Sequence, residues 1–563
     1  MEYNQNNKIG NILLELDLIT NQQLEDAIKI QKKNGLPLNE IFISMNLVEE
    51  NEILQAIEFK LGIPSVDIKN YKIEPEIIDK IPEDVARKHC VVPLAVNNNY
   101  LTLAMCDPLN LIAIEDIKTI VNMNVQPVMA PSKSIQLIHE KIYSVKTAID
   151  AVNTYKKNHA DIKENSENDL ETTLNNKSDS PVTKLVDSII QQALSMKTSD
   201  IHIESFEDCL KIRFRIDGTL REIMKLDLDM KQSIVSKIKV MANLDITEKR
   251  KPQDGRIKYS INANPFELRV SILPVISGEK VVIRVIDKTN IVLDIEKLGF
   301  LDEQIQTLKK MLLVPYGIIL VCGPTGSGKT TTLYSILSKI NDPGVNIISI
   351  EDPVEGVING INQAQVITKT GLNFAEGLRS ILRQDPDVIM IGEIRDFETA
   401  EISVRAAITG HIVLSTIHTN DSVGAVIRLS DMGVQNFIIG SAVSGVIAQR
   451  LVRKICTNCK TSYKPEPMDY KTLEIDQHES INLHKGAGCD DCGGSGYSGR
   501  IAVFELLEIT RKHKEMIANG ISESELRDFS IRNGMKSLSE SAKKYVLAGD
   551  TTIEEYLKVA YSV

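Results

Sequence analysis

Long apolar runs are missing from this chain of 563 residues. A helix that crosses a bilayer needs about 20 consecutive apolar residues, and no stretch of the sequence approaches that length. The first eight residues, Met-Glu-Tyr-Asn-Gln-Asn-Asn-Lys, contain an acid and no apolar core, so we expect no secretory signal there. We therefore expect a cytoplasmic protein that contacts a membrane only through partners.

An excess of positive charge is also missing. The formal net charge is −11 and the isoelectric point is near 5.5. Proteins that bind nucleic-acid backbones need clustered Lys and Arg, so we expect no direct nucleic-acid partner. The hydrophobic content of 42% is sufficient for ordinary cores, and the length suggests about four domains of roughly 150 residues each.

The eight cysteines fall into two groups. Four are scattered in apolar or strand-like surroundings and are expected to be small buried side chains: Cys90, Cys106, Cys209 and Cys322. The other four form two CxxC pairs, with five glycines around the second pair, and this spacing predicts a tetrathiolate zinc site. Two disulfides are the alternative, but they do not suit a cytoplasmic chain. The predicted zinc ligands are Cys456, Cys459, Cys489 and Cys492.

A glycine-rich segment at residues 323–330 has the form of a complete phosphate-binding loop. An apolar run at residues 318–322 precedes it, and apolar residues at helical spacing follow it, which is the strand–loop–helix setting that such a loop requires. A turn of purely structural use is the alternative. The expected nucleotide contacts are Gly323, Pro324, Thr325, Gly326, Ser327, Gly328, Lys329, Thr330 and Thr331, with Lys329 on the β- and γ-phosphates and Thr330 on Mg²⁺.

Two acidic residues follow apolar runs further along the chain. Glu351 ends the run 347–350 and is a candidate general base. Glu393 follows the run 388–391 and is expected near Mg²⁺, directly or through water. Gly392 stands where an aspartate is usual, so the division of roles between the two glutamates is open.

Two histidines, His411 and His418, bracket a third apolar run at residues 412–417. His418 is expected to sense the γ-phosphate or to link subunits. Taken singly, an acidic strand end fits a solvated position and a strand histidine fits a structural one. Their order after a phosphate-binding loop, within one sheet-sized window, favours a catalytic site.

The N-terminal segment contains an internal repeat with an offset of 29 residues. Each copy is expected to form a helix, a turn and a second helix, so that residues 1–66 make one small helical module. The repeat pairs Ile9 with Leu38, Ile12 with Ile41, Leu13 with Phe42, Leu18 with Leu47, Ile19 with Val48, Leu24 with Ile53, Ala27 with Ala56 and Ile28 with Ile57.

The rest of the chain divides by composition and pattern. Strands are expected at residues 91–96 and 100–105, with a helix at 111–122. Residues 154–180 are mostly polar and charged, which is typical of a linker. The expected parts are an α/β N-terminal domain (67–148), a flexible linker (149–180), an α/β domain that precedes the phosphate loop (181–289), a phosphate-loop domain (290–450), and a zinc module with C-terminal helices (451–563).

The α/β domain that precedes the phosphate loop contains a strand in which Arg213 and Arg215 alternate. Alternate residues of a strand point to the same face, so these arginines form a two-cation patch that can offset phosphate charge. Ordinary surface ion pairing is the other interpretation.

Four segments together resemble the secretion ATPase superfamily that drives type II secretion and type IV pilus assembly. They are the Walker A loop (323–330), an acidic box (351–355), an atypical Walker B segment (387–393) and a His box (409–418). The resemblance extends to residues 199–204 and 252–256 and to the four paired cysteines, so it covers essentially residues 180–563.

This resemblance implies a fold, an assembly and a set of partners. The fold class is α/β multidomain: a P-loop, RecA-like ATPase core preceded by a PAS-like α/β domain, an N-terminal helical repeat module and a zinc-bearing C-terminal region. It implies a homohexamer in which Arg213 and Arg215 of one subunit reach a neighbour's nucleotide, with Arg395 and Arg405 as weaker candidates. It also implies an inner-membrane platform protein and cytoplasmic pilus or secretion assembly proteins as partners, with the motor peripheral to the inner face of the cytoplasmic membrane.

The N-terminal repeat resembles a module that binds cyclic di-GMP through two tandem copies. Three positions depart from that module: Lys8 stands where an arginine is common, Asn39 replaces a glycine, and Lys60 occupies the position equivalent to Gln31. Lysine does not reproduce the bidentate pairing of a guanidinium. Cyclic di-GMP binding and protein docking are therefore both open.

The leading functional hypothesis is an ATPase that uses ATP and Mg²⁺ to power pilin polymerisation in a type IV pilus. Retraction motors of the superfamily look shorter and lack both the leading domains and the zinc module, which favours an assembly or export motor. The alternatives are a type II secretion ATPase, a DNA-uptake or conjugation ATPase, and a nucleotide-gated scaffold without useful turnover.

Overall fold

The computed structural model describes residues 8–139 and 180–561, apart from positions 17, 35–37, 46, 49, 67, 69, 70, 72, 133, 137, 262, 263 and 288–291. The chain divides into two compact units, and everything from residue 284 onward belongs to the second. Within the described ranges, no helix is both long and apolar enough to cross a membrane. The predicted linker, residues 149–180, lies outside the described residues except for Ser180.

The N-terminal repeat forms four helices, as the 29-residue offset predicts. Leu13 and Phe42, which the repeat pairs, are both completely buried in one core, and Ala27 and Ala56 are buried in the same core. The ammonium of Lys60 lies 2.8 Å from the Glu15 carboxylate and joins the last helix to the first. The helices are α1 (Lys8–Glu15), α2 (Asn21–Asn34), α3 (Leu38–Ser44) and α4 (Glu50–Leu61).

A three-stranded sheet follows this module, in the order β1-β2-β3. The first two strands are antiparallel and are joined by Asn98 and Asn99, which both adopt the positive φ that a tight two-residue hairpin needs. The third strand runs parallel to the second. The elements are α5 (Pro75–Ile78), α6 (Glu83–His89), β1 (Val91–Asn97), β2 (Tyr100–Met105), α7 (Leu111–Val121) and β3 (Asn124–Met129), which confirms the two predicted strands and the helix.

The segment between the linker and the phosphate-binding loop contributes a six-stranded sheet in the order β6-β5-β4-β9-β8-β7. Buried and half-buried residues alternate along most of β5, as its period-two pattern predicts. The likeness to a PAS domain stays a prediction. The elements are α9 (Pro181–Ser195), β4 (Asp200–Ser205), β5 (Leu210–Ile216), β6 (Thr219–Leu226), α10 (Lys231–Met241), β7 (Gln253–Ile261), β8 (Asn264–Val275) and β9 (Gly278–Asp287).

The second unit is built on a seven-stranded sheet in the order β12-β11-β13-β14-β10-β15-β18. All neighbouring strands pair in parallel except β15 and β18. The strands β10, β11 and β13 are buried along their whole length, which explains why they appear in the sequence as continuous apolar runs. The strands are β10 (Gly317–Cys322), β11 (Ile347–Glu351), β12 (Asn362–Gln365), β13 (Val388–Ile391), β14 (Ile412–Ile417), β15 (Val443–Ile455) and β18 (Tyr497–Glu508).

Each face of this sheet has its own apolar core. Alternate residues of β10 divide between them: Leu320 belongs to one core and Val321 to the other. The first core includes Val404 of α14 and Val426 of α15, and the second includes Leu333 of α12. The helices are α11 (Asp302–Leu312), α12 (Lys329–Ile340), α13 (Phe374–Ile381), α14 (Phe397–Ile408), α15 (Ser422–Asp431) and α16 (Asn436–Ala442).

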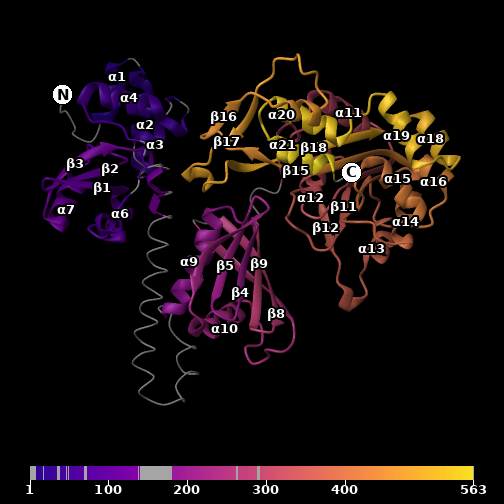
Figure 1. The fold of residues 1–563 in the computed structure, drawn as a ribbon, viewed down its shortest axis with the longest axis horizontal. Helices are drawn as coiled ribbons and strands as arrows, with labels where there is room; N and C mark the ends of the chain where they lie inside the picture. The colour runs from indigo at the N-terminus through magenta and orange to yellow at the C-terminus, as the bar shows by residue number, and fades with distance from the viewer. Residues whose placement is uncertain are drawn as a thin grey trace. The chain divides into compact units, whose positions relative to one another are not determined.

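The predicted boundary between residues 450 and 451 needs a correction. It falls inside β15, and β18 returns from beyond the cysteine segment to extend the same sheet. Figure 1 shows β15 and β18 beside α20 and α21, which pack against these strands. The remaining elements are β16 (Lys460–Tyr463), α17 (Pro467–Thr472), β17 (Leu483–Gly486), α18 (Arg511–Ala518), α19 (Glu523–Arg532), α20 (Leu538–Leu547) and α21 (Ile553–Ala560).

Candidate active site

The phosphate-binding loop connects β10 to α12, as the sequence predicts. Gly323, Gly326 and Gly328 have φ values of 147°, 79° and 86°, a region that favours glycine. A Cβ atom on Gly323 would lie 2.4 Å from the carbonyl oxygen of Gln449 on β15. Only glycine therefore fits at this point, where the loop leaves the sheet.

Polar groups of the loop turn toward its interior. The Nζ atom of Lys329 donates to the carbonyl oxygens of Gly323 at 2.8 Å and Pro324 at 3.0 Å, and burial lowers the pKa of this ammonium. The Oγ atom of Ser327 is buried and has no hydrogen-bond partner among the described residues. Thr330 and Thr331 lie half-buried in the first turn of α12. A buried unpaired hydroxyl beside a lysine and a helix N-terminus suits an anion such as a phosphate group.

Glu393 and His418 come together although they follow different strands. The Glu393 side chain, only 12% exposed, pairs through Oε1 with Nη2 of Arg395 at 2.6 Å. Its Oε2 atom lies 3.4 Å from Nε2 of His418. The hydrogen bond to Glu393 raises the pKa of Arg395. The sequence identified all three residues as candidates but did not place them in one cluster.

Two backbone-directed contacts hold the strand ends that carry this cluster. The Thr416 hydroxyl donates to the carbonyl oxygen of Gly392 at 2.7 Å, and the N–H of Ile394 donates to the carbonyl oxygen of Thr416 at 2.9 Å. The ends of β13 and β14 are therefore locked to each other, which sets the distance between Glu393 and His418.

Glu351 is the last residue of β11 and is 3% exposed. Its carboxylate accepts hydrogen bonds from the Tyr334 hydroxyl at 2.5 Å, the Ser349 hydroxyl at 2.7 Å and Nε2 of Gln363 at 3.0 Å. Burial and the bond to Glu351 raise the pKa of Tyr334. These contacts join α12 to β11 and β12. The role of Glu351 as a general base stays a prediction, and no sequence signal pointed to Tyr334 or Gln363.

His411 and Arg405 contact other residues than Glu393 and its partners. The Nδ1 atom of His411 lies 3.0 Å from the carbonyl oxygen of Ala406, so the ring contacts the end of α14. Arg405 pairs with Glu401 one turn earlier on the same helix and is largely exposed. Both have local structural partners in this chain.

Arg213 and Arg215 lie on one face of β5, each beside an acid of β4. The Nε atom of Arg213 lies 2.6 Å from Oε2 of Glu204, and Nε of Arg215 lies 3.7 Å from Oδ2 of Asp200. Burial alone would raise the pKa of Glu204, but hydrogen bonds from Arg213 and Lys280 outweigh it and hold that pKa at about 2. The proposed contact of both arginines with a nucleotide stays a prediction.

A pocket of about 370 Å³ lies beside the loop and was not foreseen from the sequence. Arg450 of β15 forms part of its wall, and Nη2 of this residue donates to Oδ1 of Asn420 at 3.3 Å. Burial lowers the pKa of Arg450. The lining residues are Pro324, Asn420, Arg450, Leu451, Val452, Glu555, Lys558 and Val559.

The four paired cysteines form one cluster, with all four sulfur atoms within 4.8 Å of one another. The Sγ–Sγ distances are 3.8 Å for Cys456 and Cys489, 3.9 Å for Cys459 and Cys492, and 3.7 Å for Cys489 and Cys492. A tetrahedron with metal–sulfur bonds of about 2.3 Å has edges of about 3.8 Å. The cluster can therefore hold a metal ion.

Backbone N–H groups also point at these sulfur atoms. Cys492 Sγ accepts from the N–H of Cys489 at 3.1 Å and of Gly496 at 3.2 Å, and Cys459 Sγ accepts from the N–H of Gly488 at 3.3 Å. Burial alone would raise the pKa of Cys492, but these two donors, together with the side chains of Cys489 and Cys459, outweigh it and hold the pKa at about 6. Such donors stabilise the thiolate form that binds metals.

Two family models match the chain. One is described as "Type II/IV secretion system protein" and matches residues 175–558, and the other is described as "MshEN domain" and matches residues 61–149. The second match begins at residue 61, so the predicted helical module at residues 1–66 lies almost entirely before it.

Known proteins resemble the chain over nearly its whole length. The type IV pilus assembly ATPase PilB of Myxococcus xanthus is 42% identical over 557 residues, which cover 97% of this chain and 98% of that protein. The type II secretion system protein E of Xanthomonas campestris pv. campestris is 36% identical over 559 residues, 98% of each. The Legionella pneumophila ATPase DotB matches with a TM-score of 0.51 and 21% identity over 67% of this chain and 95% of that chain, which shows a shared fold.

Proposed function

The chain belongs to the type II/IV secretion system protein family, and from this premise we propose that it is an ATP-hydrolysing motor that powers assembly of a type IV pilus. The observation that carries the proposal is the 42% identity to a type IV pilus assembly ATPase across almost the full length of both chains. Type II secretion is the second candidate, because a type II secretion protein matches with 36% identity over an equal share of the chain.

The proposed motor works as a homohexamer on the inner face of the cytoplasmic membrane. Its partners are an inner-membrane platform protein and cytoplasmic assembly proteins, and it contacts the membrane only through them. Binding, hydrolysis and release of ATP change the orientation of its domains, which turns the platform protein so that pilin subunits are added.

ATP is the substrate that the loop geometry supports best. Lys329 lies within the loop, where its ammonium contacts the Gly323 carbonyl oxygen, and this position supports binding of the β- and γ-phosphates. The buried Ser327 hydroxyl, which has no hydrogen-bond partner among the described residues, supports an anion in the loop. Thr330 and Glu393 would hold Mg²⁺, which when bound neutralises charge on the phosphate oxygens. His418 lies against Glu393, which supports a role as a sensor of the γ-phosphate.

The two glutamates have different surroundings, and this supports different roles. Both oxygens of Glu351 already accept hydrogen bonds within the sheet and α12, so its direct contribution here is to position α12. Glu393 instead lies beside Arg395 and His418, whose side chains are 64% and 49% exposed. We assign Glu393 to the reacting nucleotide and its metal.

Arginines from a neighbouring subunit complete the proposed site. Arg213 and Arg215 share one face of β5, and each pairs with an acid of β4. Cations that meet the γ-phosphate only in the assembled ring would make hydrolysis depend on the arrangement of subunits.

Two substitutions in the full-length protein test the assignment of the site. Lys329→Ala should weaken ATP binding by about ten- to a hundredfold, because a charge-assisted contact to phosphate is lost. Glu393→Gln should leave ATP binding within about twofold and lower turnover by about a hundredfold or more. Titration with a fluorescent ATP analogue and steady-state phosphate release measure the two effects.

The matched control for Lys329 is Lys339→Ala, an exposed lysine at the other end of α12. This variant should bind and hydrolyse ATP like the wild type. Turnover of Lys329→Ala or Glu393→Gln at the wild-type rate would contradict the assignment.

We propose that the cysteine cluster binds one structural Zn²⁺. The four sulfur atoms have the mutual distances of a tetrahedral site, and the N–H donors are those of a thiolate cluster. Paired Cys456→Ser and Cys459→Ser substitutions should remove about one zinc per chain in elemental analysis and increase amide exchange around residues 455–497, since structural zinc contributes to folding. The same pair of substitutions at Cys209 and Cys322 should leave the zinc content unchanged. Wild-type protein without zinc would contradict the proposal.

We also propose that the N-terminal region binds cyclic di-GMP. The tandem helical repeat and the MshEN match that follows it support this ligand. Labelled cyclic di-GMP should bind the full-length protein saturably, and Lys8→Arg should tighten binding by about tenfold, because a guanidinium pairs bidentately with phosphate or guanine. A titration with no saturable binding in either protein would favour protein docking instead.

A further inference from the structure

Asp421 lies three residues beyond His418, the last residue of the His box, and has several hydrogen-bond partners. Its Oδ1 atom caps α15 by accepting from the N–H of Gly424 at 2.8 Å. Its carbonyl oxygen accepts from the Thr419 hydroxyl at 3.1 Å and from the Cys322 thiol at 3.2 Å. Cys322 directly precedes the phosphate-binding loop, so Asp421 contacts both the residues that follow the His box and the base of that loop.

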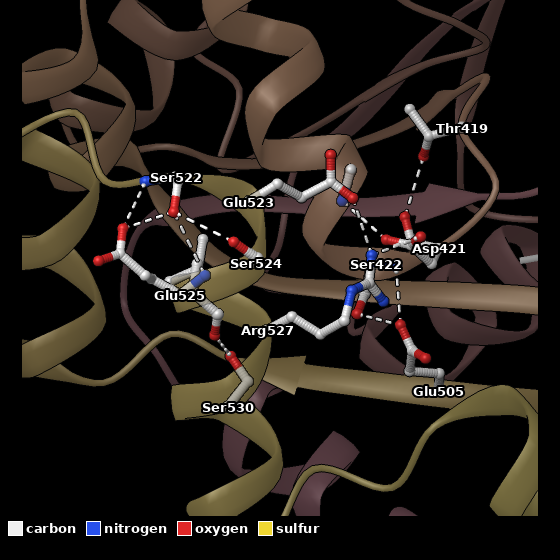
Figure 2. A network of polar contacts seen from close by, with 12 residues as sticks. Thr419, Asp421, Ser422, Glu505, Ser522, Glu523, Ser524, Glu525, Arg527 and Ser530 are labelled. Carbon is white, nitrogen blue, oxygen red and sulfur yellow. Dashed lines mark hydrogen bonds and ion pairs between the residues drawn. The ribbon is translucent and has the colours of Figure 1, made fainter.

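The C-terminal helix α19 reaches the same residue through Arg527. Nη2 of Arg527 donates to Oδ2 of Asp421 at 2.7 Å, and it also donates to Glu523 at 2.9 Å. The two side chains of the first pair are 25% and 9% exposed, so water screens this pair little. Figure 2 shows Arg527 extended between Asp421 and the segment that carries Glu523.

A second buried contact joins the next residue, Ser422, to β18 and α20 in the C-terminal part of the chain. Oε1 of Glu505, on β18, accepts from the N–H of Ser422 at 2.9 Å and from its hydroxyl at 2.5 Å. Oε2 of Glu505 accepts from the N–H of Leu538, the first residue of α20, at 3.1 Å. Glu505 is completely buried, so the start of α15 is anchored independently of Arg527.

The contacts of Glu505 and Arg527 have different effects on this segment. Glu505 fixes where α15 begins, while Arg527 acts on the Asp421 side chain, which is three residues from His418. On the other side of the segment, His418 meets Glu393 at 3.4 Å and Asn420 accepts a hydrogen bond from Arg450. The charge of Arg527 therefore acts on the segment that places His418 beside Glu393.

We propose that Arg527 is a positioning residue for ATP hydrolysis, which acts through Asp421 to hold His418 against Glu393. The inference rests on the proposed function of the same site and extends it to a residue about 200 positions beyond the phosphate-binding loop. Arg527 touches no substrate. Its ion pair makes the hydrolytic site sensitive to the position of α19.

The test compares steady-state ATP hydrolysis by full-length variants. Arg527→Gln should lower kcat by about tenfold and change KM by less than about twofold, because the phosphate-binding loop keeps its own contacts. Arg527→Lys, which keeps a cation facing Asp421, should recover most of the loss. Arg532→Gln is the matched control on α19: its Nε atom donates to the Asp528 carbonyl oxygen, and it should hydrolyse ATP like the wild type.

Asp421→Asn separates the ion pair from the helix cap. Asparagine is as good an N-cap as aspartate, so this variant removes the charge that faces Arg527 and keeps α15 intact. It should lower kcat as Arg527→Gln does, and the double variant should be no slower than either single one. In a His418→Ala background, Arg527→Gln should cause no further loss.

Three outcomes for the variants would overturn the proposal while leaving the proposed function intact. Hydrolysis by Arg527→Gln within twofold of the wild type would remove any role in positioning. A parallel fall in kcat, ATP affinity and melting temperature, without recovery in Arg527→Lys, would show a structural role only. A further loss in the His418→Ala background would show that Arg527 does not act through His418. Wild-type protein that hydrolyses no ATP would overturn the proposed function, and this inference with it.

Discussion

The parallel register of the buried strands is the constraint on which the rest of the second unit depends. Cys322 of β10 lies opposite Ile417 of β14, and Ile391 of β13 lies opposite Ser415 of the same strand. All three strands therefore end at one edge of the sheet, and whatever follows them in the chain emerges there. The phosphate-binding loop, Glu393 and His418 are those three continuations, so one set of backbone hydrogen bonds assembles the site.

The C-terminal strands and helices belong to the same folded unit as the site. The strand β18 pairs with β15, and Gln449 of β15 lies against Gly323 of the loop. The Gln449 side chain also accepts a hydrogen bond from Thr332 of α12. Buried carboxylates on this side, Glu505 and Asp421, have partners on α15, α19 and α20. Because unpaired buried charges are costly, a movement of the C-terminal helices must either carry these partners along or break the contacts.

Local patterns in the sequence predicted much of this fold. The 29-residue offset located the four N-terminal helices and their buried positions, since Leu13 and Phe42 occupy equivalent places in each copy. The loop and its flanking elements followed from glycine spacing and periodicity, because these depend on neighbours in the chain. Residues brought together by long-range pairing escaped prediction. Tyr334 beside Glu351, Arg450 beside Asn420, and β18 at the edge of the ATPase sheet left no local signal.

Mixed oligomers test the proposal that arginines of a neighbouring subunit complete each hydrolytic site. One variant would carry Arg213→Ala with Arg215→Ala, and the other Lys329→Ala; each alone should be inactive. Co-assembled in equal amounts, they should recover about a quarter of wild-type ATP hydrolysis, because an intact loop would then meet intact arginines at some interfaces. Activity no greater than the sum of the two separate variants would contradict the account.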